Sequence, residues 1–366
     1  MLRFLHAADF HLDSAFHALP LRLAAERRQE SRELLNRLAE EALRREADLV
    51  LLAGDLFDGG TVYRETLEAL AAALGRMKVP VLIAPGNHDY YNSASPYARD
   101  IWPENVHIFR SAQVEAVELP ALGCVAYGAA FVSPEQAVSP LAGFSQEGDG
   151  GRRSLMVLHG NVGAGEGCYG PVTRQEIAGS GLHYLALGHV HTASGLQRER
   201  DTYWAYPGCP EGRGFDELGE KGCYFGVLDD GGGVALTFVP LARRRYEILQ
   251  TDVTGRPPLE AVEAALPPDT AGDLYRILLT GETGEEGVDL PALTAALEGR
   301  FYALELRDCT QVRQDVWARA GEDSLRGLFL RRLRQMYEVC GSQEEREQVV
   351  RAVRFGLAAL DHRDIL

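Results

Sequence analysis

The sequence lacks cysteine pairs and long apolar runs. Its six cysteines are scattered, with no CxxC pair among them, which argues against a zinc ribbon and a disulfide framework. No apolar stretch approaches the roughly 18 residues of a membrane span. Arg3, His6 and Asp9 also interrupt the start of the chain, unlike a signal peptide. We therefore expect a cytoplasmic protein with no membrane partner.

Basic residues are also scarce. The chain has 37 Lys and Arg against 53 Asp and Glu, a net charge of −16. Binding of nucleic acid through a generally basic surface is therefore disfavoured, because neutralising phosphates requires clustered cations. A local basic strip is still compatible with this balance. The densest run is Arg243, Arg244 and Arg245, for which a solvated linker is an equally good interpretation.

Three catalytic motifs are missing as well. The sequence has no GxSxG, no GxxxxGK[ST] and no early GxGxxG, so a serine-hydrolase elbow, a P-loop and an N-terminal dinucleotide fold are not indicated. The composition, 46% hydrophobic and 25% charged, is typical of a globular protein. A length of 366 residues predicts one large domain with one or two smaller units.

The order of apolar segments predicts an α/β fold. In the first part of the chain, short apolar strands alternate with amphipathic helical stretches, which is typical of a sheet with helices on its faces. From about residue 106 the segments are shorter and mostly of β type. The expected strands are 2–8, 48–53, 79–84, 123–127, 154–158, 184–187 and 223–228, and the expected helices are 21–47 and 62–77.

A separate α/β unit is expected after Pro240. It contains strands at 246–253, 274–280 and 302–306, with helices at 259–266 and 290–297. From about residue 322 the pattern is purely helical, in two segments broken at Gly341 and Ser342, each with an apolar stripe. The predicted domains are therefore residues 1–240, 241–320 and 321–366.

Five predicted strands end in residues that bind metals. Open sheets carry ligand sites at the carboxyl ends of their strands, so we expect these ends to converge on one pocket. A single histidine beside a strand is more often structural, but five of the ten histidines fall in these clusters. The strand ends are DFH at 9–11, GDLFD at 54–58, GNHD at 86–89, HG at 159–160 and GHVH at 188–191.

The donor types indicate two metal ions. Imidazole, carboxylate and amide oxygen suit Mn²⁺, Mg²⁺, Fe²⁺ or Zn²⁺, and the absence of clustered thiolates disfavours a structural zinc site. The candidates are too many for one ion, so two ions sharing a bridging carboxylate fit better. Two such ions promote in-line attack of water at phosphorus, which predicts a phosphoesterase. The candidate ligands are Asp9, His11, Asp55, Asn87, His159, His189 and His191.

These motifs, in this order, closely resemble those of the calcineurin-like metallophosphoesterases. The resemblance covers about residues 1–240 and implies a four-layer α/β/β/α sandwich. It also implies that Asp55 bridges two ions. The implied ligands are Asp9, His11 and His191 for one ion, and Asn87, His159 and His189 for the other.

The resemblance also implies catalytic roles for two residues beside the ligands. His88 would stabilise the transition state or protonate the leaving oxygen, and Asp89 would orient His88. Some relatives carry a histidine that assists nuclease catalysis where this sequence has Asp58. Aspartate also occurs there in bacterial relatives, so Asp58 is a further catalytic candidate, and orienting a ligand or the loop is its more conservative role.

Several longer stretches are similar to SbcD-like DNA repair exonucleases, especially their YhaO-like branch. They include FLHAADFHLDSAF, PGNHDYYNSASPY and YPGCPEGRGFDELGEKGCY. The resemblance implies a Mn²⁺-dependent DNA nuclease with a small capping domain, which the unit after residue 241 would supply. It also implies an SMC-like coiled-coil ATPase partner docked on the C-terminal helices, and is compatible with a homodimer.

Two other functions remain open from the sequence. The metal motifs alone do not separate a DNA nuclease from a phosphatase or phosphodiesterase acting on nucleotides or other small esters. A non-catalytic scaffold with the same fold is a third interpretation, although every ligand position is filled and His88 is present. The helices after residue 322 could also pack on the capping domain instead of a partner.

Overall fold

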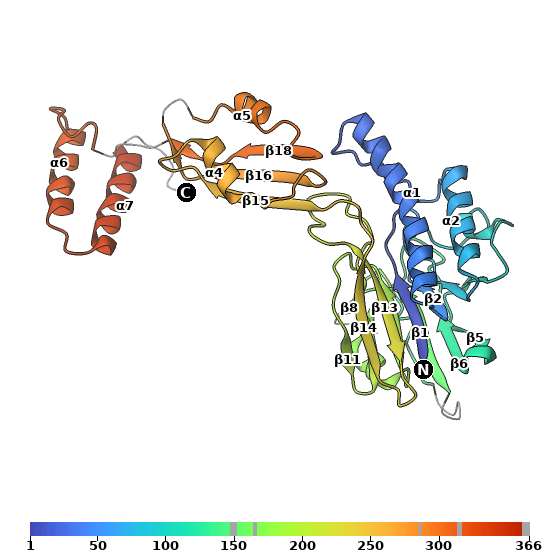
Figure 1. Ribbon diagram of the computed structural model, residues 1–366. Helices are drawn as coiled ribbons and strands as arrows, with labels where there is room; N and C mark the ends of the chain where they lie inside the picture. The colour runs from blue at the N-terminus through green and yellow to red at the C-terminus, as the bar shows by residue number, and fades with distance from the viewer. Residues whose placement is uncertain (147–151, 164–166, 285–286, 313–316, 361–366) are drawn as a thin grey trace. The chain divides into compact units, whose positions relative to one another are not determined.

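A computed structural model describes residues 1–146, 152–163, 167–284, 287–312 and 317–360 (Figure 1). Contacts within the chain define two compact units. The first contains Met1–Leu249, Pro267–Arg276 and Leu297–Glu305, and the second contains the described parts of 250–266, 277–296 and 306–366. The domain boundaries at residues 241 and 321 stay predictions, and the end of the expected helical tail, 361–366, lies outside the described residues.

The first unit contains a six-stranded sheet in the order β14-β13-β1-β2-β3-β4. Strands β1 to β4 are parallel, and β13 and β14 pair antiparallel at one side. All four residues of β2 are buried, as expected for a parallel strand covered on both faces. The strands are β1 Leu2–Ala7, β2 Leu49–Leu52, β3 Val81–Ile83, β4 Val106–Ile108, β13 Gly222–Leu228 and β14 Val234–Pro240.

A second six-stranded sheet follows the order β11-β12-β10-β7-β6-β5. Its four inner strands are parallel, and β5 and β11 pair antiparallel at the two edges. The strands are β5 Glu115–Leu119, β6 Cys124–Gly128, β7 Arg153–His159, β10 Tyr184–Gly188, β11 Gln197–Glu199 and β12 Thr202–Ala205.

Apolar clusters hold these layers together. Helices α1 Leu21–Arg44 and α2 Arg64–Met77 lie side by side (Figure 1) and bury residues such as Leu38 and Leu70 against one face of the first sheet. The other face packs on the second sheet through residues such as Leu51 and Leu155. Helix α3 Arg174–Gly179, which begins at a capping box, covers the far face of the second sheet. The predicted mixed α/β fold is confirmed.

The remainder of the chain forms smaller elements. A three-stranded sheet has the order β15-β16-β18, and α6 and α7 pack on each other through Leu330 and Val353. None of the described helices is both long and apolar enough to cross a membrane. The elements of this part are β15 Tyr246–Asp252, α4 Pro258–Ala265, β16 Leu274–Thr280, α5 Leu290–Ala296, β18 Ala303–Asp308, α6 Leu325–Glu338 and α7 Gln343–Leu360, with the minor strands β17 Glu282–Thr283 and β19 Gln311–Val312. The first unit also contains the minor strands β8 Val162–Gly163 and β9 Val172–Thr173 and the 3-10 turns Pro96–Ala98 and Pro120–Leu122.

The two large sheets come into contact at the carboxyl ends of their parallel strands. Gly188, the last residue of β10, lies against Ala53, which follows β2. A Cβ atom on Gly188 would lie 1.8 Å from the carbonyl oxygen of Ala53 and 2.9 Å from the Cβ atom of Ala8. Only glycine permits this approach, and the loops that follow β1, β2, β7 and β10 are thereby brought together.

We expect Gly188→Ala to lower the free energy of unfolding by at least about 1–3 kcal/mol, since the added methyl group meets backbone and the sheets must separate. Urea denaturation without metal measures the change. Gly179→Ala is a suitable control, because a Cβ atom on Gly179 would have nothing within 4 Å. Equal stability of Gly188→Ala and the parent would show that the sheet contact tolerates a side chain.

Candidate metal centre

The loops after β1 and β2 run together and carry strained backbone. The amide of Asp9 donates to the carbonyl of Gly54 at 3.0 Å, and the amide of His11 donates to the carbonyl of Asp55 at 2.9 Å. Asp9, His11 and Asp55 have φ angles of 56°, 43° and 50°, and His189 after β10 has 106°. Left-handed backbone at non-glycine residues is costly and clusters at functional sites, so these four positions indicate a site.

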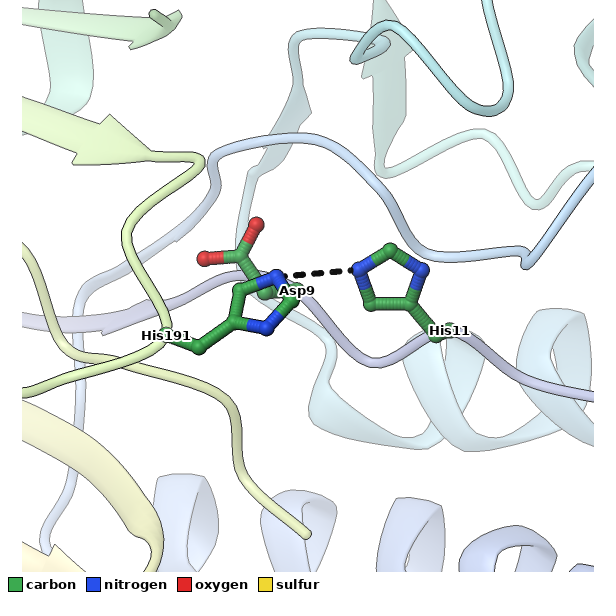
Figure 2. A group of neighbouring side chains, drawn as sticks. All are labelled: Asp9, His11 and His191. Carbon is green, nitrogen blue, oxygen red and sulfur yellow. Dashed lines mark hydrogen bonds between the residues drawn. The ribbon is translucent and has the colours of Figure 1, made fainter. Parts of the chain in front are cut away.

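Asp9, His11 and His191 form one group of potential ligands, with donor atoms within 4.8 Å of one another. Figure 2 shows the two imidazoles facing each other, with 3.2 Å between their Nε2 atoms. The Nδ1 atom of His11 lies 3.1 Å from a carboxylate oxygen of Asp58, and that of His191 lies 2.7 Å from Glu217. When both Nδ1 atoms donate to these carboxylates, each Nε2 of a neutral ring keeps a lone pair; the guanidinium of Arg213 also lies 3.1 Å from Nδ1 of His191.

This arrangement fits a divalent cation. Two nitrogen lone pairs that face each other repel unless a positive charge lies beside them. Their 3.2 Å separation is compatible with two nitrogens bound at about 2.1 Å to one ion. The carboxylate of Asp9 completes a donor set of two nitrogens and one oxygen. The donor types and their arrangement thus fit a divalent cation.

A second group consists of Asp9, Asp55 and His159. His159 donates from Nδ1 to the carbonyl of Ala53 at 2.9 Å, so its Nε2 carries a lone pair once the ring is neutral. This Nε2 atom lies 3.0 Å from Oδ1 of Asn87 and 3.4 Å from Oδ2 of Asp55. Again the facing atoms are acceptors, as in a second cation site.

Asp55 belongs to the second group and also approaches His11 of the first group. Its Oδ2 atom is 3.4 Å from Nε2 of His159 and 3.7 Å from Nε2 of His11. Its Oδ1 atom accepts the amide hydrogen of His88 at 2.9 Å. A Cβ atom on Gly86 would lie 2.2 Å from the same Oδ1 atom, so the glycine before Asn87 is needed for the carboxylate to fit.

His189 lies beside the second group. Its ring centroid is 5.3 Å from that of His159 and 5.4 Å from that of Tyr169. Its amide donates to both carboxylate oxygens of Asp9, at 2.9 and 3.1 Å. Among the described residues, the imidazole of His189 does not belong to any group of three ligand atoms that lie within 4.8 Å of one another. Its expected role as a ligand stays a prediction.

Burial keeps two of the imidazoles, those of His11 and His189, in the neutral form that binds metal. It lowers the pKa values of His11 and His189 to about 4, so both rings are neutral at pH 7. Burial also raises the pKa of Asp9 to about 6. For His159, burial is outweighed by the charges of Asp55 and Asp9, which raise its pKa to about 9. A proton thus balances the buried carboxylates until a cation takes its place.

His88 and Asp58 border the first group. His88 is exposed, and its ring centroid lies 4.8 Å from that of His11. Its Nδ1 atom lies 3.3 Å from the backbone oxygen of Asp58. Ligand atoms of His11, Asp58 and His88 lie within 4.8 Å of one another. The Asp58 carboxylate accepts the Nδ1 hydrogen of His11, and whether Asp58 is catalytic or orients this ligand stays a prediction.

Asp89 is buried beneath the site. Its carboxylate accepts the amide hydrogens of Gly86 at 2.8 Å, Leu56 at 2.7 Å and Phe57 at 3.1 Å, and the hydroxyl of Tyr97 at 2.5 Å. These contacts join the loop after β2 to the loop after β3. The proposed orienting of His88 would therefore act through the backbone, and it stays a prediction.

The sequence did not single out Arg213, Glu217 or Tyr97 individually. Glu217 binds the imidazole of His191, Arg213 binds Glu217, and Tyr97 binds Asp89. Arg213 and Glu217 belong to the GRGFDELGEKG segment, whose resemblance to nucleases was the available signal. Tyr97 is the last residue of the PGNHDYYNSASPY stretch, whose resemblance to nucleases was likewise the available signal.

The centre agrees with the comparisons to known proteins. The calcineurin-like phosphoesterase family profile matches residues 2–193. The chain therefore belongs to the calcineurin-like phosphoesterase family, which binds divalent metals, and the predicted resemblance is confirmed.

Several curated proteins are similar to this chain. The uncharacterized metallophosphoesterase YhaO of Bacillus subtilis is 31% identical over 69% of this chain and 64% of its own length. The DNA double-strand break repair protein Mre11 of Aeropyrum pernix is 28% identical over the same shares. A subunit of nuclease SbcCD from Staphylococcus epidermidis is 22% identical over 69% of this chain and 73% of its own. The chain thus spans a little under two thirds of the first two relatives.

We expect Asp55→Asn to weaken binding of both ions by at least about 10- to 100-fold, a loss already typical when only the partner of a ligand is removed. The substitution removes the charge that lies between the two groups. Metal content after gel filtration in Mn²⁺ buffer measures the effect. Asp201→Asn is the control, because its side chain is fully exposed. Two tightly bound ions in Asp55→Asn would contradict a bridging role.

Proposed function

We propose that this protein is a two-metal phosphodiesterase that hydrolyses DNA. The observation that carries the proposal is the Asp55 carboxylate between two sets of facing acceptor atoms. We assign Asp55 to both ions, with Mn²⁺ as the preferred metal. The proposed ligands are Asp9, His11 and His191 for one ion, and Asn87, His159 and His189 for the other.

The chain's own residues have distinct parts in the proposed reaction. When bound, the two ions activate a water molecule and stabilise negative charge on the phosphoryl group. His88 is exposed beside His11, so it reaches the solvent side where a phosphodiester binds. We assign it the role of donating a proton to the leaving oxygen or stabilising the transition state. Asp58 and Asp89 position His11 and the loops around His88.

DNA as substrate is supported by relatives and opposed by charge. Mre11 of Aeropyrum pernix is named as a DNA break repair protein, and the Staphylococcus epidermidis relative as part of a nuclease. The net charge of −16 instead favours a small phosphate ester. We propose DNA, with a nucleotide or other small ester as the second candidate.

The C-terminal helices support a partner for the nuclease. Helices α6 and α7 bury Leu330 and Val353 against each other, yet large apolar side chains remain outside this contact. A coiled-coil ATPase of the SMC type would cover them in a repair complex. In this proposal residues 1–240 are the catalytic domain, 241–320 the cap and 321–366 the dock. The exposed apolar side chains among the described residues of this part are Leu325, Leu328, Met336, Val339, Phe355 and Leu360.

We expect His88→Ala to retain both metal ions and to lower kcat by about 10²- to 10⁴-fold, the usual contribution of a general acid or base. The metal ions should be retained because Asp55 is held by the backbone amide of His88 and not by its imidazole. Metal content and turnover of a chromogenic phosphodiester measure the two properties in one preparation. His17→Ala is a control outside the motifs. Turnover equal to the parent would remove His88 from the mechanism.

The substrate class is tested with the purified Mn²⁺ protein on linear duplex DNA, single-stranded DNA and a chromogenic phosphodiester, with chelator controls. A DNA enzyme should lose affinity for DNA steeply as salt rises, because phosphate contacts release counterions. Hydrolysis of a small ester should change little. Cleavage of the small ester alone would favour the second candidate, and metal-loaded protein inert toward all three would favour a scaffold.

A further inference from the structure

The segment after β12 holds the backbone of His191. The carbonyl of His191 accepts the amide of Cys209 at 3.3 Å and the ammonium group of Lys221 at 3.2 Å. Gly208 fits because it has no side chain, since a Cβ atom there would lie 2.9 Å from the same carbonyl oxygen. The position of His191 is thus set by residues 208–221 as well as by its own loop.

Glu217 in this segment also holds the imidazole of His191. The carboxylate is buried, with a relative exposure of 5% for the residue. Its Oε1 atom accepts from Nδ1 of His191 at 2.7 Å and from the guanidinium of Arg213 at 2.8 Å, and its Oε2 atom accepts the amide of Arg213 at 2.7 Å. These hydrogen bonds orient His191 and Arg213.

Arg213 joins the two histidines of the first group. Its guanidinium donates to Glu217 at 2.8 Å and to Asp58 at 3.3 Å. The same Asp58 oxygen lies 3.1 Å from Nδ1 of His11. The rigid fork of an arginine fixes the separation of two carboxylates that would otherwise repel each other. We refer to His191, Glu217, Arg213, Asp58 and His11 as the orienting chain.

Helix α1 anchors the start of the segment. Arg27 on α1 is fully buried and donates to Glu30 at 2.6 Å, to the carbonyl of Gly212 at 3.0 Å and to Glu211. These acceptors offset part of the cost of burying the guanidinium charge. The turn that carries Arg213 is therefore attached to the body of the first unit.

The second group of ligands is oriented by different means. Nδ1 of His159 donates at 2.9 Å to the carbonyl of Ala53, a main-chain group where the two sheets meet. Asn87 and Asp55 contact His159 directly. The orienting chain comes near these residues through His11, which lies 3.7 Å from Asp55. One candidate ion position thus depends on a side-chain network, and the other on backbone.

We propose that Arg213 and Glu217 are positioning residues for only one of the two ions, the ion held by Asp9, His11 and His191. The inference rests on the proposed two-metal function. Removing Glu217 takes away the Nδ1 partner of His191, and removing Arg213 takes away the link between Glu217 and Asp58, so the two Nε2 atoms are no longer held facing each other. The ion at Asn87 and His159 keeps its ligands in place.

The test titrates metal-free protein with Mn²⁺ by isothermal calorimetry, and electron paramagnetic resonance counts bound ions and detects coupling between them. The parent should bind two ions. Glu217→Ala should weaken one by about 10- to 100-fold and leave the other unchanged, so that at two equivalents the spectrum is that of an isolated ion. Arg213→Lys should show the same selective loss, because the charge remains but the fork is lost.

Control variants separate positioning from folding. Glu220→Gln lies in the same segment, with an exposed side chain at the surface, and should bind both ions like the parent. Glu217→Gln retains the size of the side chain and should recover part of the lost affinity. Thermal denaturation of the metal-free variants checks that each is folded.

Two results would overturn the inference while leaving the two-metal function intact. One is parent-like binding of both ions in Glu217→Ala and Arg213→Lys. The other is equal weakening of both ions in these variants, which would mean that the segment supports the whole site. A parent protein that binds no Mn²⁺ would instead refute the proposed function itself.

Discussion

The carbonyl oxygen of Ala53 is the point on which the rest of the centre depends. It lies against Gly188 of the second sheet and accepts the Nδ1 hydrogen of His159. The absence of a side chain at Gly188 lets the two sheets meet at their carboxyl ends. Ligands from both sheets can then face one another, and the amide of His189 reaches the carboxylate of Asp9.

Bringing the ligands together requires strain and unbalanced charge. Four left-handed residues, at about 1–3 kcal/mol each, persist only because surrounding hydrogen bonds determine their conformation. Buried carboxylates and lone pairs without an intervening hydrogen add to the cost. A divalent cation relieves this charge, so metal affinity and local stability are coupled. The two sides of the centre differ in how their imidazoles are held, one by side chains and the other by backbone.

Buried strands were easier to predict from the sequence than edge strands. The expected strand at 274–280 and the expected helices after residue 322 match β16, α6 and α7 closely, because apolar periodicity is strong where a face is covered. The inner strand β12 was an exception, since it was not expected. The other unexpected strands of the two large sheets are β4, β5, β11 and β14. They lie at sheet edges, where half of the residues or more are polar or partly exposed, and so the pattern is weak. Helix α1 ends at Arg44, before the predicted residue 47, because Glu46 adopts a left-handed backbone.

The sequence by itself determined the chemistry of the centre, since carboxylate, amide and imidazole donors at five strand ends imply metal whatever the loop conformations are. Only the tertiary structure decided how each donor is turned. The Nδ1 partners of His11, His159 and His191 lie 47, 106 and 26 residues away along the chain, and no local pattern records such contacts. Asp89, adjacent to His88 in the sequence, binds the backbone amides of the surrounding loops, because a buried carboxylate must find hydrogen-bond donors.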